Sequence, residues 1–390
     1  PRAGFNNWTG SCSGDASCSI NLPPGGATFD ARLDHFNFAF VTSLKFNGNN
    51  DNFFSVARCD ALARDGGLPL GTYVPMRTYG TAFLLDVFTN RPGFAAARGW
   101  VRTDGKPVAD QFTSNYVTSK PRFPISCDEH GVCLNPATTE LFWTGMYLGS
   151  TGYLIDNGFG GNGNCVDWSS STGTGIAGNV FGVLDRGTED DRNFANVPTC
   201  DTLLRGVCLE LDRRVPFGKF FDLPVPLGGR RAFVSNGLVS GLATAAGVNG
   251  LCRGEAADAG LPRATTYVAL RATTIAPASA LLQLDGGDWF RVDGFRVATA
   301  ASMSGVVLAP SQAPLILNAR GIPVPDAGVE RLVWTGSVAP GALCTNCCTN
   351  WSSTTGVARA GSTQLLSGGW WSDQSLSCSS SLASVYCFEN

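Results

Sequence analysis

The stretch Arg58-Cys-Asp-Ala-Leu-Ala-Arg-Asp-Gly-Gly-Leu-Pro69 returns later in the chain as Leu251-Cys-Arg-Gly-Glu-Ala-Ala-Asp-Ala-Gly-Leu-Pro262. An internal repeat of this kind constrains the architecture before any single element is assigned. In the first copy Val56, Cys59 and Ala63 have helical spacing, and the glycines followed by Pro69 are typical stop signals. Residues 53–65 are therefore expected to form a short amphipathic helix, with a matching helix in the second copy.

The repeat continues in the same order to the end of the chain. Its further matches are Trp100-Val-Arg-Thr-Asp-Gly with Trp289-Phe-Arg-Val-Asp-Gly, Phe142-Trp-Thr-Gly with Val333-Trp-Thr-Gly, Cys165-Val-Asp-Trp-Ser-Ser with Cys348-Thr-Asn-Trp-Ser-Ser, and Cys200–Glu210 with Cys378–Glu389. The Asp-Gly pairs predict two-residue hairpin turns in which both turn residues have positive φ. Because Trp100/Trp289, Trp143/Trp334 and Trp168/Trp351 recur, we assign these residues to the cores.

Two homologous domains follow, at residues 38–212 and 231–390, with a separate segment at 1–37. The linker 213–230 contains Pro216, Pro224 and Pro226. Proline stiffens a connecting segment, so we expect a fixed angle between the domains.

The 14 cysteines are an even and high number, which indicates disulfides and an oxidising compartment. The repeat suggests their pairing, because corresponding cysteines bracket the two copies. Bridges that close such long loops stabilise a domain by about 3–5 kcal/mol each. The expected pairs are Cys59–Cys208, Cys252–Cys387, Cys165–Cys200, Cys348–Cys378, Cys12–Cys18, Cys127–Cys133 and Cys344–Cys347. Cys344-Thr-Asn-Cys347 also has the form of half a zinc site, but the sequence has no second Cys-x-x-Cys to complete one.

Composition excludes some partners. With 28 Lys+Arg against 31 Asp+Glu, the formal net charge of −3 gives no cationic surplus for nucleic acid. No apolar run reaches the roughly 18 residues that a transmembrane helix needs, so no transmembrane segment is expected. Gly reaches 48 and charged residues only 15%, while 44% of positions are hydrophobic, which is typical of a loop-rich globular protein.

The linked motifs together resemble a bacterial domain of unknown function that is related to endostatin and to the C-type lectin-like fold. The clearest segment runs from Val333-Trp-Thr-Gly to Tyr386-Cys-Phe-Glu389, and the resemblance covers both copies. It implies an α+β fold of two tandem, disulfide-stapled C-type lectin-like domains with long loops. Members of this family occur on bacterial surfaces and include spirochaete endostatin-like proteins that bind host matrix and complement regulators. The resemblance therefore implies an extracellular or cell-surface location more than it implies an activity.

The first residues resemble a different family. Gly4-Phe-Asn-Asn-Trp-Thr-Gly-Ser-Cys12 through Cys18, followed by Ala27-Thr-Phe-Asp-Ala, is similar to the closing strands of a divergent internalin-type β-repeat. A simple hairpin closed by Cys12 and Cys18 is the alternative. The resemblance implies that residues 1–37 end a longer β-domain, and that the natural chain either extends upstream or was trimmed by proteolysis.

Catalysis is not expected. Acid–base or nucleophilic chemistry usually needs a histidine or a tuned carboxylate pair in a cleft. The two histidines, His35 and His130, have no counterparts in the other copy, and Gly158-Phe-Gly-Gly-Asn-Gly lacks the lysine of a phosphate loop. A hydrolase with a carboxylate pair between the domains is the third and weakest hypothesis.

Ligand binding remains open, and no cofactor is expected unless calcium binds. The sequence lacks the Glu-Pro-Asn, Gln-Pro-Asp and Trp-Asn-Asp triplets with which lectins hold calcium and sugar. Asn162, Asn164 and Asp167 offer polar ligand contacts, although they also suit tight turns. Glu189, Asp190 and Asp191 could bind calcium or form a solvated acidic loop. Trp370 and Trp371, which have no counterpart in the first copy, are predicted to be exposed aromatic contacts.

These features favour a non-catalytic secreted or cell-surface bacterial protein that binds a glycan or an extracellular protein through its loop face. Adhesion is the role expected. The alternative is a structural subunit of an extracellular filament, appendage or surface layer, in which the loop faces contact further copies of the chain.

Overall fold

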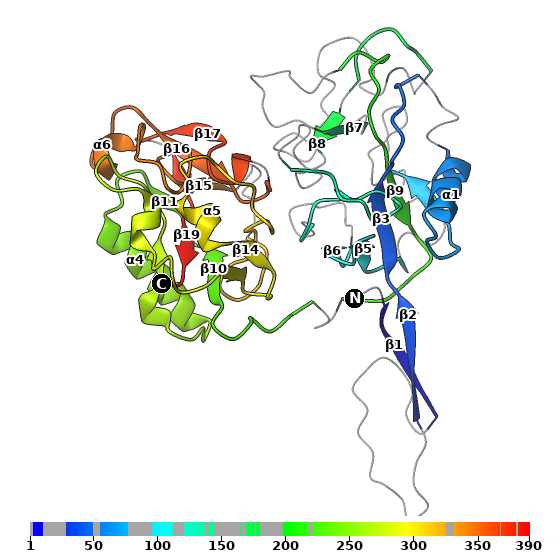
Figure 1. Ribbon diagram of the computed structural model, residues 1–390, viewed down its shortest axis with the longest axis horizontal. Coiled ribbons are helices and arrows are strands. Elements are labelled where there is room, and N and C mark those ends of the chain that lie inside the picture. The colour runs from blue at the N-terminus through cyan, green and yellow to red at the C-terminus, as the bar shows by residue number, and fades with distance from the viewer. Residues whose placement is uncertain are drawn as a thin grey trace, which may run out of the picture. The chain divides into compact units, whose positions relative to one another are not determined.

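The computed structural model divides the chain into two compact units, shown as ribbons in Figure 1. The first unit consists of Pro1–Leu134 and Glu140–Phe220, and the second of Asn135–Thr139 and Phe221–Asn390. The structure describes residues 3–10, 29–49, 55–76, 96–111, 121–136, 140–143, 165, 169–175, 177–179, 198–217, 221–324, 331–366, 368–379 and 381–390.

The first unit is built mainly from short strands. β1 (Ala3–Gly10) and β2 (Phe29–His35) pair in an antiparallel two-stranded sheet. The elements that follow are β3 (Asn37–Val41), α1 (Val56–Asp65), β4 (Tyr73–Pro75), β5 (Trp100–Arg102), β6 (Pro107–Ala109), β7 (Leu141–Trp143), β8 (Ala177–Asn179) and β9 (Val207–Glu210). The central sheet has the order β4-β9-β3-β5-β6, and β7 pairs with β8.

The second unit repeats this plan and extends it. Its elements are β10 (Arg230–Val234), β11 (Val239–Ser240), α4 (Ala245–Asp258), η2 (Ala264–Thr266), β12 (Val268–Ala269), η3 (Ala278–Leu281), β13 (Trp289–Arg291), β14 (Arg296–Ala298), α5 (Ala300–Ser304), β15 (Leu332–Trp334), α6 (Cys348–Trp351), β16 (Val357–Ser362), η4 (Gly368–Trp370), β17 (Gln374–Ser377), β18 (Leu382–Ala383) and β19 (Tyr386–Phe388). Its central sheet has the order β12-β19-β10-β13-β14, and β15-β16-β17 form a second sheet.

The two central sheets share one topology. β3 lies parallel to β5 and antiparallel to β9, as β10 lies parallel to β13 and antiparallel to β19. The outer pairs β4–β9 and β12–β19 are antiparallel in both units. The repeat in the sequence is therefore a structural repeat, and the mixed α+β class is confirmed.

Both predicted helices form. In α1 the Ser55 side chain caps the first turn by accepting from the Arg58 amide, and the helix ends at Gly66. In α4 Thr244 plays the same part by accepting from the Gly247 amide. Such N-caps satisfy amides that have no partner within the helix.

Six of the seven expected cysteine pairs are disulfides. They are Cys59–Cys208, Cys127–Cys133, Cys165–Cys200, Cys252–Cys387, Cys344–Cys347 and Cys348–Cys378, while Cys12 and Cys18 lie outside the described residues. Cys59–Cys208 joins α1 to β9, and Cys252–Cys387 joins α4 to β19. In each unit this strand is the last one of the central sheet along the chain. Disulfides in this number indicate an oxidising environment.

Recurrent tryptophans occupy equivalent core positions. The Trp100 indole donates to the Glu210 carbonyl and the Trp289 indole to the Glu389 carbonyl, both at 2.8 Å. Trp143 and Trp334, both fully buried, donate in the same way to carbonyls of their own units. Trp351 is also buried, whereas Trp168 lies outside the described residues.

The Asp-Gly hairpins form, but the predicted turn geometry is wrong. Gly105 and Gly294 have positive φ (85° and 84°), whereas Asp104 and Asp293 do not, and each hairpin has a register shift at its tryptophan. The aspartates instead accept from an arginine of the preceding strand, as Asp293 does from Arg291 at 2.8 Å. This ion pair is compatible with a type I turn followed by one left-handed glycine.

The segment between the units packs at both of its ends. The Phe217 ring lies 5.7 Å from Phe36 in the first unit. Further on, the Leu223 amide donates to the Asp293 carbonyl in the second unit. Just after the second anchor, Leu227 is fully exposed in a turn that is closed by Gly229 N donating to Pro226 O.

We predict that limited proteolysis cuts the exposed stretch 222–228. The resulting C-terminal fragment should run as one piece on a non-reducing gel, because all six cysteines beyond residue 228 pair with one another. Exposed backbone is the preferred site of cleavage. A C-terminal fragment that remains attached to the first unit until a reducing agent is added would contradict this prediction.

A buried tyrosine in each unit provides a matched stability test. The Tyr73 hydroxyl donates to Pro69 O at 3.1 Å and to Glu210 at 3.3 Å, whereas the buried Tyr267 hydroxyl has no hydrogen-bond partner among the described residues. Burial raises the pKa of both phenols. Tyr73→Phe should therefore lower the free energy of unfolding by about 1–2 kcal/mol. Tyr267→Phe should change it by less than about 0.5 kcal/mol or increase it.

Chemical denaturation of both variants with intact disulfides tests this pair. Equal losses in the two variants would contradict the assignment of hydrogen bonds.

Candidate functional site

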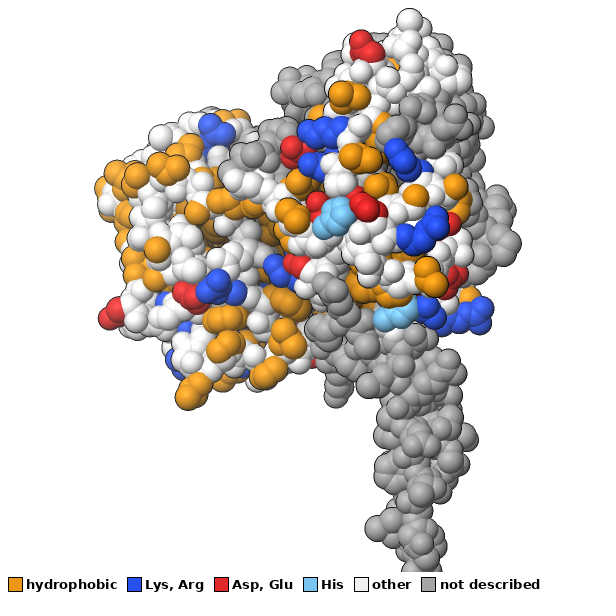
Figure 2. All heavy atoms as spheres, turned by 45° about the vertical axis from the view of Figure 1, so that its right-hand side comes forward, with side chains coloured by type: hydrophobic (Ala, Val, Ile, Leu, Met, Phe, Trp, Pro, Cys, Tyr) orange, Lys and Arg blue, Asp and Glu red, His pale blue; other side chains and the backbone are white. Residues whose placement is uncertain are grey.

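The second unit exposes a group of large aliphatic side chains on three loops. We call this group the loop patch. Its members, with their relative exposure, are Ile275 (88%), Leu281 (38%), Val306 (68%), Val307 (81%), Val338 (43%) and Leu343 (49%). Figure 2 shows hydrophobic side chains at the surface of the second unit, at the left of the view. Clustered exposed aliphatic residues mark interaction sites, whereas single ones are common on any protein.

No charge interrupts the sequence that carries the loop patch. The runs 272–284, 297–319 and 332–358 contain no Asp, Glu, Lys, Arg or His. Depletion of charge distinguishes the centre of a protein–protein interface from the rest of a protein surface. The loops of the second unit therefore present an uncharged, aliphatic surface.

Backbone hydrogen bonds join the three loops, 272–281, 304–310 and 335–344. Cys344 N donates to Thr273 O at 3.0 Å and Ser279 N to Pro340 O at 3.0 Å. Gly341 N donates to Gly305 O at 3.1 Å. These bonds hold together the three segments that carry the exposed aliphatic side chains.

The prediction that Trp370 and Trp371 are exposed is wrong. They retain only 3% and 0% of their accessible surface. Trp370 packs edge-on to Trp371, with ring centroids 5.3 Å apart, and both rings pack against Tyr386. The physical reason is a set of long-range contacts, because Tyr386 belongs to β19 of the central sheet and Trp370 ends η4, which packs against β16 of the second sheet.

These buried indoles hold the loops of the patch from within. Trp371 Nε1 donates to Ser337 Oγ at 3.1 Å, and Trp370 Nε1 donates to Ala309 O at 2.9 Å. Trp351 Nε1 donates to Ala272 O at 3.0 Å. Each of the three loops is thus fixed by one tryptophan, so the patch is preorganised.

The Cys-x-Asn-Trp motif forms an unusual turn beside the patch. All four residues of α6 have positive φ, from 51° to 65°, which makes them one turn of left-handed helix. Such a conformation costs about 1–2 kcal/mol per residue without glycine. The Cys348–Cys378 disulfide holds it, and the Asn350 side chain both accepts from Thr274 N and donates to Thr274 Oγ1.

Arg271 lies under this turn. Its guanidinium stacks 4.3 Å from the centre of the Trp351 ring and donates to Ala243 O at 2.7 Å. Burial lowers the pKa of Arg271 to about 10. It is a packing element and not an exposed charge, which leaves the surface above it uncharged.

Two carboxylates near the ends of the central sheets, the buried Glu129 and the half-buried Glu255, have a structural role. In the first unit Glu129, from the loop 128–132, accepts from the Ser43 amide at 2.9 Å. In the second unit Glu255, from α4, accepts from the equivalent Asn236 amide at 2.9 Å. Equivalent backbone amides in the two units are therefore bound by carboxylates that come from different elements.

Two arginines, the half-buried Arg205 and the buried Arg331, also hold equivalent backbone groups from different elements. Arg205, before β9, donates to the carbonyls of Thr42 and Ser43. Arg331, before β15, donates to the equivalent carbonyls of Ser235 and Asn236. In the two units, equivalent backbone carbonyls are bound by arginines that come from different elements. The role of these arginines is therefore to hold the backbone.

The two histidines also lie against carboxylates. His35 Nε2 is 3.0 Å from Glu210 Oε1, which also lies 3.4 Å from Arg213 Nε. His130 Nε2 is 3.6 Å from Asp65 and 3.7 Å from Glu129. Glu129 also accepts from both the amide and the hydroxyl of Ser43, so the arrangement ties the loop 128–132 to the end of β3.

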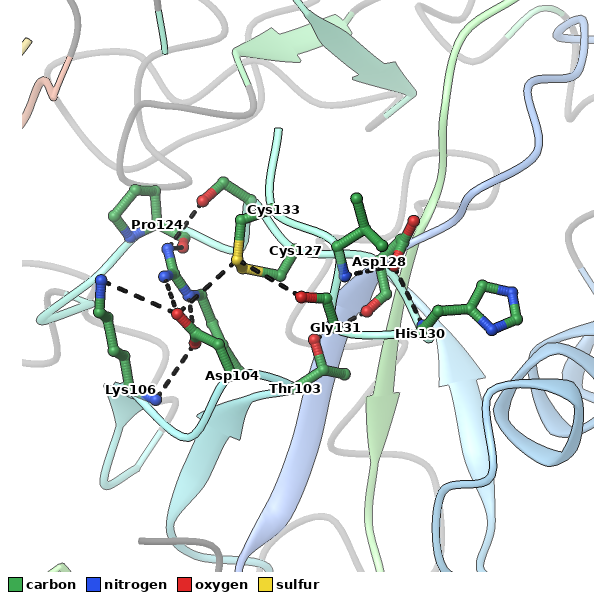
Figure 3. Close-up of a disulfide and its surroundings, with 12 residues drawn as sticks. Thr103, Asp104, Lys106, Pro124, Cys127, Asp128, His130, Gly131 and Cys133 are labelled. Atoms are coloured by element: carbon green, nitrogen blue, oxygen red, sulfur yellow. Dashed lines mark hydrogen bonds and ion pairs between the residues drawn. A yellow bond between two sulfur atoms is a disulfide. The ribbon is translucent and has the colours of Figure 1, made fainter. Parts of the chain in front are cut away.

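One group of metal-ligand residue types exists in the described part of the chain. Asp104, Cys127 and Cys133, which Figure 3 labels, offer ligand atoms that lie within 4.8 Å of one another. The two sulfurs are bonded to each other. They are therefore not available as the thiolates that a metal would need.

The remaining predicted binding residues lie outside the described residues. They are Asn162, Asn164 and Asp167 of the expected polar loop, and Glu189, Asp190 and Asp191 of the expected calcium loop.

Sequence reasoning missed the loop patch, although a signal was present. The three uncharged runs are long for a chain in which 15% of residues are charged. Their aliphatic residues have no strand or helix period that would assign them to a core. Uncharged loops without such a period were the available indication of an exposed apolar surface.

No protein-family model matches the chain, and no curated protein matches it at a significant level. Among the described residues, no helix has both the length and the apolar character to cross a bilayer.

Proposed function

We propose that this chain is a non-catalytic extracellular protein of a bacterial surface, and that the loop patch of the second unit binds an extracellular protein. The single observation that carries the proposal is the uncharged aliphatic patch, in which Ile275 and Val307 are 88% and 81% exposed. Exposing such side chains to water is unfavourable by roughly 25 cal/mol per Å². Their burial against a partner is therefore a source of binding free energy.

The patch favours a protein partner over a glycan. Glycan sites need polar groups for hydroxyls and a free aromatic face, whereas Trp370 and Trp371 are buried. Aliphatic side chains with no charge among them match the apolar centre of a protein interface. We therefore place adhesion to a protein ahead of sugar recognition.

The C-type lectin-like assignment belongs to the same proposal. Its support is a small sheet with a helix fastened to its last strand, long loops and recurrent tryptophans in both units. In such a fold, ligand specificity resides in the loops, which a rigid scaffold positions.

A binding assay with a charged patch variant tests the proposal. The chain is immobilised and exposed to a panel of purified extracellular-matrix proteins and to a glycan array, each with and without EDTA. The variant is Ile275→Asp with Val307→Asp. The control is Leu70→Asp, since Leu70 is 79% exposed on the first unit. Fully exposed sites should tolerate these changes without loss of folding.

We expect saturable binding to a matrix protein that survives EDTA, falls at least tenfold in the patch variant and is unchanged in the control. Binding to glycans alone, or binding that ignores the patch variant, would overturn the proposal. Concentration-dependent polymers that disappear in the patch variant, seen by sedimentation velocity, would favour the structural-subunit alternative instead.

A further inference from the structure

The Cys127–Cys133 disulfide closes a turn that the second unit builds without a disulfide. In the first unit Asp128 N donates to Val132 O at 3.0 Å and Leu134 N to Ser126 O at 2.9 Å. In the second unit Asn318 N donates to Ile322 O at 2.9 Å and Val324 N to Ile316 O at 2.9 Å. Leu317 and Pro323 pair in the second unit where the two cysteines pair in the first.

The side-chain caps of the two turns also agree. Asp128 Oδ1 accepts from the amides of His130 and Val132, as Asn318 Oδ1 accepts from those of Arg320 and Ile322. Each turn is also fixed to its own central sheet in the same way, because Val41 N donates to Cys127 O and Val234 N to Leu317 O, both at 3.0 Å. The second unit therefore forms this turn without a bridge, and the first unit has the same hydrogen bonds to hold its turn.

The two sulfurs of this bridge differ in exposure. Cys127 is fully buried, whereas Cys133 is exposed. Figure 3 shows the bridge beside Asp104 and Lys106. Asp104 Oδ2 lies 3.7 Å from Cys133 Sγ, and its charge is matched by Arg102 and by Lys106 at 3.8 Å. The three charged groups together carry a net positive charge, which does not repel an approaching thiolate.

We propose that Cys133 is a thiol-exchange site, at which an external thiol attaches covalently to the first unit. A thiolate RS⁻ attacks Cys133 Sγ, the Cys127–Cys133 bond breaks, and Cys127 leaves as a thiolate that takes a proton from solvent. The products are RS–S–Cys133 and the Cys127 thiol, so sulfur is neither gained nor lost. The electrons come from the external thiol, and the released Cys127 can reverse the step by attacking Cys133. Exposed disulfides are the labile ones, whereas buried ones resist exchange.

The proposed site lies in the first unit, and the inference does not depend on the proposed function. The test incubates the native, full chain with reduced glutathione, stops the exchange with acid, alkylates free thiols in denaturant so that the buried Cys127 is reached, and maps every cysteine by mass spectrometry. A second arm uses a small protein with one exposed cysteine in place of glutathione. The control is Cys127→Leu with Cys133→Pro, which copies the second unit and should fold.

We expect the adduct on Cys133 and alkylation on Cys127 to appear at least tenfold faster than reaction at any other cysteine, and to be absent in the control. If the protein thiol forms an adduct, a protein can supply the thiol that attaches to Cys133. If only glutathione forms one, the site accepts small thiols and excludes proteins. No adduct at Cys133, or earlier opening of another disulfide, would overturn the proposal. Binding to the matrix panel should be unchanged in the control, so the two proposals can fail separately.

Discussion

Replacement of both Cys252 and Cys387 by alanine is expected to lower the free energy of unfolding by about 4–5 kcal/mol. The bridge joins α4 to β19 across a sequence separation of 135 residues. In the chain-entropy model, a cross-link over a span of that length restricts the unfolded chain by roughly that amount. Both cysteines are also fully buried, so truncation removes packing in the same place.

The matched control is the double variant Cys127→Leu with Cys133→Pro. Its bridge has a sequence separation of six residues, for which the same model gives about 2 kcal/mol. The second unit already holds Leu317 and Pro323 at these positions. Guanidinium denaturation with the other disulfides intact compares the variants, and losses of equal size would show that loop length is not the determining factor.

Trp371→Ala is expected to destabilise the second unit by about 3–5 kcal/mol and to release the loop 335–344. The side chain is fully buried, it stacks on Tyr386 at 6.3 Å, and its indole donates to Ser337 Oγ. Removing a buried aromatic residue leaves a cavity that the surroundings fill only in part.

Trp371→Phe separates the contribution of the buried ring from that of the indole hydrogen bond to Ser337. It keeps a buried ring and removes the indole hydrogen bond, so a loss of about 1–2 kcal/mol is expected. Hydrogen exchange should increase within 335–344 in both variants, while α4 changes little in the phenylalanine variant. An alanine variant as stable as the wild type would place Trp371 at the surface, as the sequence alone suggested.

The sequence predicted the architecture where the two copies could be compared. Because Cys59 and Cys252 have equivalent positions, as Cys208 and Cys387 do, the repeat reduced many possible pairings to one. The helix over Val56–Asp65 followed from local signals, namely its apolar spacing and its glycine stop.

Where the copies differ, the sequence could not determine the environment. Trp370 and Trp371 have no equivalents in the first copy. Without knowledge of its packing partners, a tryptophan in a loop is predicted to be exposed. Their burial depends on the packing of β15-β16-β17 and on Tyr386, which are long-range contacts. The loop patch was missed because exposed and buried aliphatic residues look alike in sequences without a period.

Hydrogen–deuterium exchange on the full chain, with and without the panel protein that binds it most tightly, tests the central claim most directly. The account predicts protection within 272–281, 304–310 and 335–344, the three loops that carry Ile275, Val307 and Leu343. Protection confined to the first unit, with these loops unchanged, would contradict the assignment of the loop patch as the binding surface.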